Sequence, residues 1–218
     1  MNNIMKSPVK LRNKHVITIL VCALLSFGLF CTALAQSTTV KAEASSSQPR
    51  LGDTLTVNIK IANVENLFGV DVALSWNTSV LKVIDSEAYL GVESYPEGVL
   101  HETASNTIDV LEDTASQSLG QYHLLATSTG SASAFSGSGT IATVTFNVTD
   151  TGDTGLFLET ELSDKPASGE TANLISHTDT VDSVTAVIPE FPTIAVLALM
   201  ALATVSIIVS TKKLKTRF

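Results

Sequence analysis

The chain has 218 residues, of which 44% are hydrophobic and 16% are charged, and its formal net charge is −8. Acidic residues are concentrated between residues 36 and 188, where 20 Asp and Glu and five Lys and Arg give a net charge of −15. A surface of this sign repels phosphate backbones, so we predict no nucleic-acid partner. The excess of carboxylates is typical either of a well-solvated exterior or of a surface that attracts a cationic partner.

Residues 1–35 have the pattern of a secretory signal peptide. Four cations precede an apolar run over residues 16–34, which closes on Ala-Leu-Ala. Small residues at these positions mark a signal peptidase site, so cleavage is predicted after Ala35. The length of the run also fits a retained N-terminal anchor. Both cysteines, Cys22 and Cys31, lie in this segment, so a cleaved chain has neither a disulfide nor a thiolate nucleophile.

Residues 189–218 have the pattern of a C-terminal membrane anchor. Pro189, Glu190 and Phe191 precede an uncharged stretch over residues 193–210, and four cations follow it. About 20 apolar residues cross the hydrocarbon layer as a helix, and flanking cations stay in the cytoplasm. We therefore predict one transmembrane helix with a basic cytoplasmic tail, which places residues 36–188 on the extracellular face of the cell membrane.

The Pro-Glu-Phe motif at Pro189, Glu190 and Phe191 also resembles the sorting signals of archaeal surface proteins that archaeosortases cut. The resemblance implies removal of the tail near Pro189 and transfer of the domain to a lipid. A permanent single-pass anchor is the alternative, because the same residues serve as a stop-transfer segment.

Residues 36–188 are predicted to form one all-β domain. Apolar side chains alternate with polar ones over residues 55–61, 68–76 and 142–148, and turn-forming residues separate these runs. The pattern is typical of a β-sandwich with Phe68, Trp76 and Phe146 in its core. A small helix is the alternative within residues 85–120. The predicted strands, about nine in number, lie near residues 39–44, 54–62, 67–76, 80–84, 107–111, 121–128, 140–148, 156–162 and 180–187.

An ordered set of motifs in this domain resembles the cohesin domain. The set comprises LGDTLTV at residues 51–57, NVENLFGVD at 63–71, LSWNTSVLKV at 74–83 and SGSGTIATVTFNV at 136–148. The resemblance covers residues 38–188. It implies a nine-stranded jelly-roll β-sandwich that binds a dockerin, a small calcium-loaded helical module of other secreted proteins. It further implies that the protein is not an enzyme and needs no cofactor.

The resemblance also implies a partner-binding face. Cohesins commonly use an acidic residue on the third strand, and Asp71 falls at that position. Alternation independently places Asp71 and Ala73 on the solvent side of their strand. In the same frame Leu124, Thr127 and Gly130 match further contacts of the family. Because residues 121–128 do not alternate cleanly in polarity, a core position is the alternative for Leu124.

Other motifs give little support for catalysis or for a metal site. His101, His123 and His177 lack ligand spacing, and the serines near residue 136 lack the Gly-x-Ser-x-Gly context of a hydrolase. The acidic stretch at residues 150–153 is predicted to be a tight turn. The sequons at Asn77 and Asn147 are candidate glycosylation sites.

Two alternative functions remain open at this stage. A carbohydrate-binding sandwich stacks sugars on exposed aromatic rings, for which Tyr89, Tyr95 and Phe135 are the available loop residues. Such a set offers at most a weak glycan contact. The other alternative is a structural or adhesive surface protein without a dedicated ligand.

Overall fold

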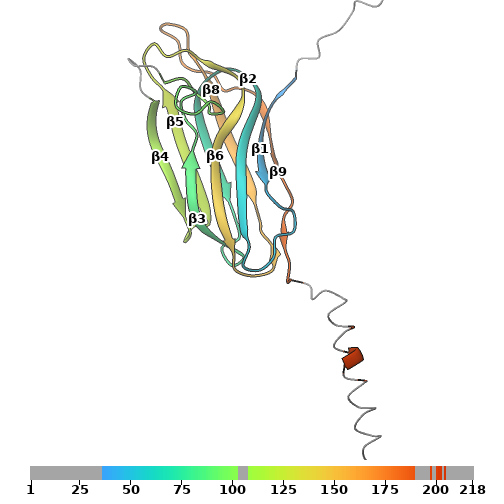
Figure 1. The fold of residues 1–218 in the computed structure, drawn as a ribbon. Helices are drawn as coiled ribbons and strands as arrows, with labels where there is room; N and C mark the ends of the chain where they lie inside the picture. Colours follow the sequence, from blue (N-terminus) through green and yellow to red (C-terminus); the bar gives the residue numbers. More distant parts are fainter. Residues whose placement is uncertain (1–35, 103–107, 190–196, 198–199, 203, 205–218) are drawn as a thin grey trace, which may run out of the picture. The chain divides into compact units, whose positions relative to one another are not determined.

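The computed structural model describes residues 36–102, 108–189, 197, 200–202 and 204, and the fold lies in the compact unit that begins at Ser37 (Figure 1). The prediction of an all-β sandwich is confirmed. Its strands are β1 (Thr38–Ala44), β2 (Thr54–Ser75), β3 (Leu81–Ala88), β4 (Ile108–Ser116), β5 (Gln121–Ser128), β6 (Phe135–Val148), β7 (Gly152–Asp153), β8 (Phe157–Asp164), β9 (His177–Val181) and β10 (Thr185–Ala186).

Several predicted features fall outside this description. Ala35, Glu190, Phe191 and most of the predicted spanning segment lie among the residues that are not described, whereas Pro189 is described and exposed. Within the described residues, no helix has the length and apolar character needed to cross a membrane.

Strand β2 belongs to both layers of the sandwich. Its first part pairs with β1 and β6, and its last part, from Leu67 to Ser75, pairs with β5 and β8. Between these parts Asn63 and Asn66 have positive φ angles of 56° and 60°, and the β6 register shifts there. Asparagine tolerates this left-handed conformation better than most residues, and such bulges bend a strand. The two predicted strands at 54–62 and 67–76 are therefore one bent strand.

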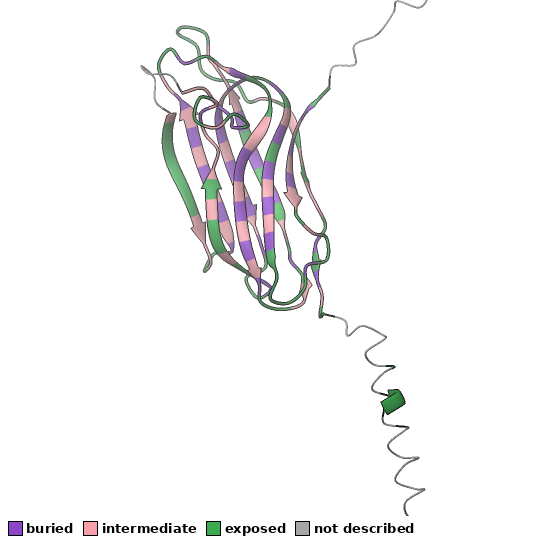
Figure 2. Ribbon diagram, viewed as in Figure 1, coloured by how far each residue is buried: buried purple, intermediate pink, exposed green. Residues whose placement is uncertain are grey.

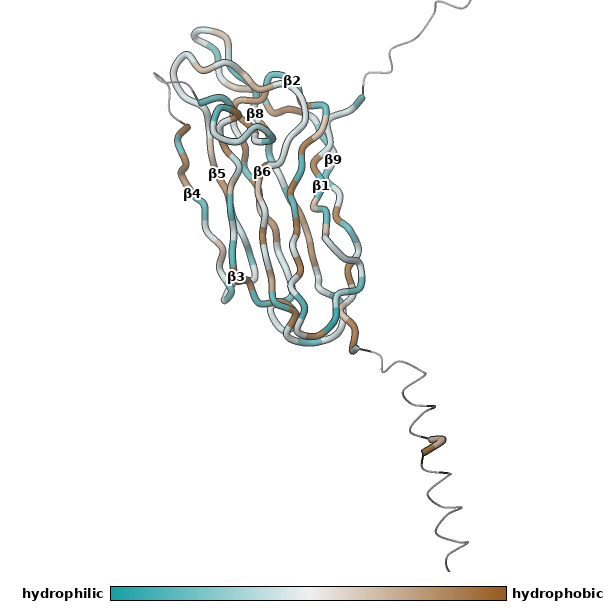
Figure 3. The backbone as a smooth tube through the Cα atoms, viewed as in Figure 1, coloured by the Kyte–Doolittle hydropathy of each residue, from teal (hydrophilic) through white to brown (hydrophobic). Residues whose placement is uncertain are grey.

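This bend produces two packed layers. One layer has the strand order β3-β6-β2-β1-β9, and the other has the order β4-β5-β2-β8 (Figure 1). All the neighbours in these orders are antiparallel except β1 and β9, which are parallel. Buried positions alternate with partly exposed ones along much of β2, along β5 and along the second half of β6 (Figure 2), and hydropathy alternates along the same parts of β2 and β6 (Figure 3). Period-two patterning is what lets each strand bury a single face.

The core fills the space between the two layers. Trp76 and Phe146 meet edge to face, with 4.9 Å between ring centroids, and both rings are buried. This confirms the predicted core positions of these two aromatic residues. Phe68 differs from the prediction because the β8 register shifts between Leu67 and Gly69, which turns Leu67 into the core. Phe68 is only half-buried, and the Lys165 ammonium lies 5.4 Å from its ring centroid.

Residues 85–120 contain strands, turns and isolated bridges but no helix in the part that is described. Strand β3 extends to Ala88, and β4 forms the free edge of the second layer. Most of β4 is exposed, including Val110 and Leu111. Edge strands are commonly protected by charged side chains, and Asp109, Glu112 and Asp113 supply them here.

Candidate functional site

The outward side of the second layer forms a nearly uninterrupted sheet surface, which we call the four-strand face. The pairing of the strands determines which outward side chains stand next to one another across this face. Asp71 stands opposite Glu161 on β8 and Leu125 on β5, while Ala73 stands opposite Glu159 and His123. The outward positions are Phe157, Glu159, Glu161 and Ser163 on β8, Gly69, Asp71, Ala73 and Ser75 on β2, Gln121, His123, Leu125 and Thr127 on β5, and Asp109, Glu112, Thr114 and Ser116 on β4.

His123 bridges two carboxylates at the centre of this face. Its Nε2 lies 2.8 Å from Asp71 Oδ1, and its Nδ1 lies 2.9 Å from Glu112 Oε2. A neutral imidazole has only one N–H, so two hydrogen bonds to carboxylates require the doubly protonated ring. The hydrogen bond to Asp71 is the main cause of a raised pKa of His123; Glu112 raises it further, and partial burial opposes both. The bridge therefore joins β2, β5 and β4 through a cation.

A shallow depression lies beside the bridge, and Gly69 is one of the residues that line it. It encloses about 280 Å³ and is lined by apolar and polar side chains of the three neighbouring strands. Leu111 and Leu174 on its margins are 67% and 72% exposed. A Cβ atom at position 69 would lie 2.5 Å from Ser163 Oγ, so a larger residue there would require the Ser163 side chain to move. Glycine at this position lets the side chains of Ser163 and Thr127 approach the strand closely.

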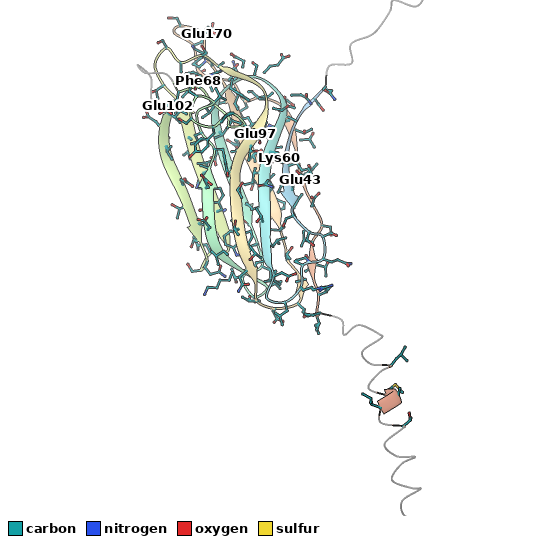
Figure 4. All side chains as sticks on the ribbon, viewed as in Figure 1. Glu43, Lys60, Phe68, Glu97, Glu102 and Glu170 are labelled. Atoms are coloured by element: carbon teal, nitrogen blue, oxygen red, sulfur yellow. The ribbon has the colours of Figure 1, made fainter. Side chains whose placement is uncertain are left out.

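The fixed charges of the four-strand face are predominantly negative. Its outward positions carry five carboxylates, and none of the described residues at these positions is Lys or Arg. The opposite layer of the sandwich is different, because it carries lysines that pair with carboxylates. There Lys60 Nζ lies 2.6 Å from Glu43 Oε2 (Figure 4). Lys41 Nζ lies 2.9 Å from Asp182 Oδ1.

The structure brings three of the predicted contact residues together on the four-strand face, namely Asp71, Ala73 and Thr127, all of them half-buried. Gly130 lies in the exposed turn after β5, with a φ of 64°. Their contacts with a partner stay a prediction. The prediction for Leu124 is wrong, because its side chain is fully buried in the core and cannot reach a partner.

The reason for the error at Leu124 lies in the polarity of β5. Its buried positions hold Tyr122, Leu124, Ala126 and Ser128, and its outward positions include His123 and Leu125. Polar and apolar residues occur on both sides, so polarity alone does not reveal which side is buried. His123 and Leu125, the neighbours of Leu124, therefore lie on the outward side of β5, and Leu124 does not. Sequence reasoning also missed Glu112 and Gly69, whose roles depend on pairing between strands.

The remaining candidate sites are weaker. No group of three or more His, Cys, Asp or Glu in the described part of the chain is placed to hold a metal ion. At residues 150–153 each aspartate accepts a hydrogen bond from a nearby backbone N–H, as in a turn. Of the sequons, Asn77 uses its side chain to accept from Ser79 N and to donate to Asp153 O, whereas Asn147 lies half-buried on the outward side of β6.

The aromatic residues considered for a glycan platform do not form one. Phe135 is 8% exposed and belongs to the core, which contradicts its predicted loop position. Tyr89 and Tyr95 contact each other edge to face at 5.1 Å, with an interplanar angle of 65°. Sugar stacking requires a free ring face in a flat arrangement, and this pair is not flat.

The fold and the face together define a class, that of mainly antiparallel β-sandwich modules with a flat, acidic sheet surface. Residues 38–187 match the family model described as the cohesin domain, so the chain belongs to the cohesin family. No curated protein matches the chain.

Two solved structures with TM-scores of 0.50 and 0.51 agree on the fold, and a third is similar at a lower score. A type II Cohesin-X-Dockerin complex from Acetivibrio cellulolyticus has 13% identity and a TM-score of 0.50, and the match covers 69% of this chain and 99% of that one. The type II cohesin dyad of the ScaA scaffoldin from the same organism has 14% identity and a TM-score of 0.51 over 69% of this chain and 50% of that one. A non-cellulosomal cohesin from the archaeon Archaeoglobus fulgidus has 21% identity and a TM-score of 0.45 over 70% of this chain and 92% of that one.

Proposed function

We propose that this protein is a non-catalytic binding module that captures a dockerin-type protein partner on the four-strand face. Family membership supports a cohesin role, and one similar structure is itself a cohesin–dockerin complex. The position of Asp71 is the main reason for assigning the partner to this face. It lies in the middle row of an open sheet surface, at the margin of a partly apolar depression and among four further carboxylates.

The shape and charge of this surface fit a helical partner with basic residues. A flat sheet face offers a broad contact area, and Leu111, Leu125 and Leu174 supply apolar surface around the depression. Protein–protein interfaces combine buried apolar surface with polar and charged contacts in this way. The carboxylates favour encounter with a cationic surface and disfavour an acidic one.

The location of the module is a further part of the proposal. A signal peptide that ends at Ala35 and a membrane anchor after Pro189 place the domain outside the cell, where secreted dockerin-bearing proteins are accessible. Mass spectrometry of the protein extracted from its native membrane tests this. A mature mass that begins at Gln36 is expected, and a mass without residues 193–218 supports sorting near Pro189 over a permanent anchor.

Binding is tested by titrating the full-length chain, purified in a non-ionic detergent, with a panel of calcium-loaded dockerin modules. We expect saturable binding that is lost with EDTA, and at least a tenfold loss in Asp71→Lys, because a new cation meets the basic partner. Asp85→Lys makes the same charge change on the opposite layer and is expected to bind normally. Equal losses in both variants would contradict the assignment of the face.

A further inference from the structure

We propose that the partner presents a side-chain cation to Asp71, which displaces His123, and an aliphatic side chain one helical turn away, which enters the depression at Gly69. This inference rests on the proposed function, because it specifies the chemistry of the partner at the same face. The occupant is a helix with a Lys or Arg and a Leu-like residue at positions i and i+4.

The existing ion pair between His123 and Asp71 requires the incoming group of the partner to be a cation. Asp71 already accepts a hydrogen bond from the His123 imidazolium at 2.8 Å, so an incoming group must replace a charged donor. Charge-assisted hydrogen bonds are about twice as strong as neutral ones, and a hydroxyl or amide donor from the partner would therefore lose this competition. A guanidinium or an ammonium group replaces the imidazolium without leaving a carboxylate unpaired.

The groups around His123 favour the same exchange. From β2 it faces Asp71 and the uncharged Ala73, and from β4 it faces Glu112 and the uncharged Thr114. On β8, beyond β2, the outward charges are Glu159 and Glu161. No Lys or Arg occupies the described outward positions of these four strands, so the protonated His123 is the one cation there that opposes an incoming cation, and this repulsion ends when His123 gives up its proton.

The spacing of the two features matches a helix. Gly69 and Asp71 are two residues apart on one strand, which separates them by roughly 6.6 Å. Side chains at i and i+4 on a helix have Cβ atoms about 5–6 Å apart and lie on one face. An apolar side chain and a cation on adjacent turns therefore reach the depression and the carboxylate together. The rim residues Leu111, Leu125 and Leu174 provide the apolar contacts for the first of them.

The exchange at Asp71 is coupled to the release of protons from His123, which can be measured. The hydrogen bond to Asp71 is the main reason that the pKa of His123 is raised, and the displaced ring loses it. A second cation close by lowers the pKa of His123 further. Binding therefore releases protons near neutral pH, and linkage requires the affinity to increase as the pH rises through the pKa of His123 in the free protein.

The test uses a probe of known chemistry, a fluorescent alanine-based helical peptide with Arg and Leu at i and i+4. Its binding to the full-length chain is followed by anisotropy at pH 5.5 and pH 8, and a matched peptide carries Glu in place of Arg. Calorimetry in two buffers of different ionisation enthalpy measures proton release. We expect the Arg peptide to bind about tenfold more tightly at pH 8, the equivalent of one pKa unit, with net proton release.

Three variants sharpen the comparison. His123→Gln is expected to bind the Arg peptide equally at both pH values and without proton release. His101→Gln removes a histidine whose ring contacts Glu93, away from the four-strand face, and is expected to keep the pH dependence. Asp71→Asn is expected to remove the preference for Arg over Glu.

The outcomes separate this inference from the proposed function. Dockerin binding without pH dependence or proton release would overturn the exchange at Asp71 and leave the binding function intact. Peptide binding as expected, with no response to any dockerin, would support the exchange and refute the dockerin assignment. Equal binding of the Arg and Glu peptides at pH 8 would overturn the inference outright.

Discussion

The side-chain amide of Gln117 pairs with the edge of β3 as a neighbouring strand would. Its Oε1 accepts from Val83 N at 2.8 Å, and its Nε2 donates to Leu81 O at 3.1 Å. Gln117 lies in the turn between β4 and β5, in the second layer, whereas β3 is the edge of the first. One side chain therefore ties the two layers together at their open edge and satisfies two backbone groups.

Removal of this amide should destabilise the domain. Gln117→Ala leaves the N–H of Val83 and the C=O of Leu81 without these partners, so we expect a loss of about 1–3 kcal/mol in the free energy of unfolding. Urea unfolding followed by Trp76 fluorescence measures it. Gln48→Ala, an exposed glutamine, is the matched control and should change stability little. Equal stability of the two variants would show that water replaces the Gln117 contacts.

Leu124 and Leu125 are adjacent leucines that point to opposite sides of β5. Leu124→Ala opens a cavity in the core and should cost about 2–5 kcal/mol in unfolding free energy. Leu125→Ala removes a half-buried side chain from the four-strand face, so its main effect should be weaker partner binding. Thermal unfolding and a binding titration of both variants check the assignment. A reversed order of the two stabilities would mean that the register of β5 is off by one residue.

Gly69 is crowded by its neighbours, whereas its backbone conformation does not require glycine. In Gly69→Ala the new Cβ would approach Ser163 Oγ to 2.5 Å, so one of them must move. We expect a destabilisation of about 1–3 kcal/mol, typical of overpacking. Ser163→Ala removes the clashing oxygen and should restore part of this loss when combined with Gly69→Ala. A double-mutant cycle measures the coupling, and strictly additive effects would contradict the contact.

The pKa of His123 is raised in the folded state, which sets the sign of its contribution to stability. A group with a raised folded pKa stabilises the fold fully below its unfolded pKa, near 6.5, and loses this contribution as the pH rises through the folded pKa. His123→Gln should therefore reduce stability at pH 5.5 and have a smaller effect at pH 8.5. NMR titration of the ring gives the folded pKa directly. A value at or below 6.5 would show that the bridge does not form in solution.

Alternation along single strands was enough to predict much of this protein. The sandwich, the core positions of Trp76 and Phe146, and the outward position of Asp71 all follow from a period of two, which is a local property of an extended chain. The strand runs at 54–62 and 67–76 were also visible in the sequence. Their union into one bent strand was not, because it depends on how Asn63 and Asn66 pair with β6.

Only the tertiary structure decided which side of β5 is buried and which residues meet on the four-strand face. Leu124 and Leu125 are chemically identical, so packing against the opposite layer alone distinguishes them. The bridge through His123 joins Asp71, 52 residues earlier, to Glu112 on a third strand. Such neighbours are set by register between strands distant in sequence, and a one-residue change of register would separate them. The sequence by itself thus determined the layers and the outward position of a key carboxylate, and the pairing of strands decided what surrounds it.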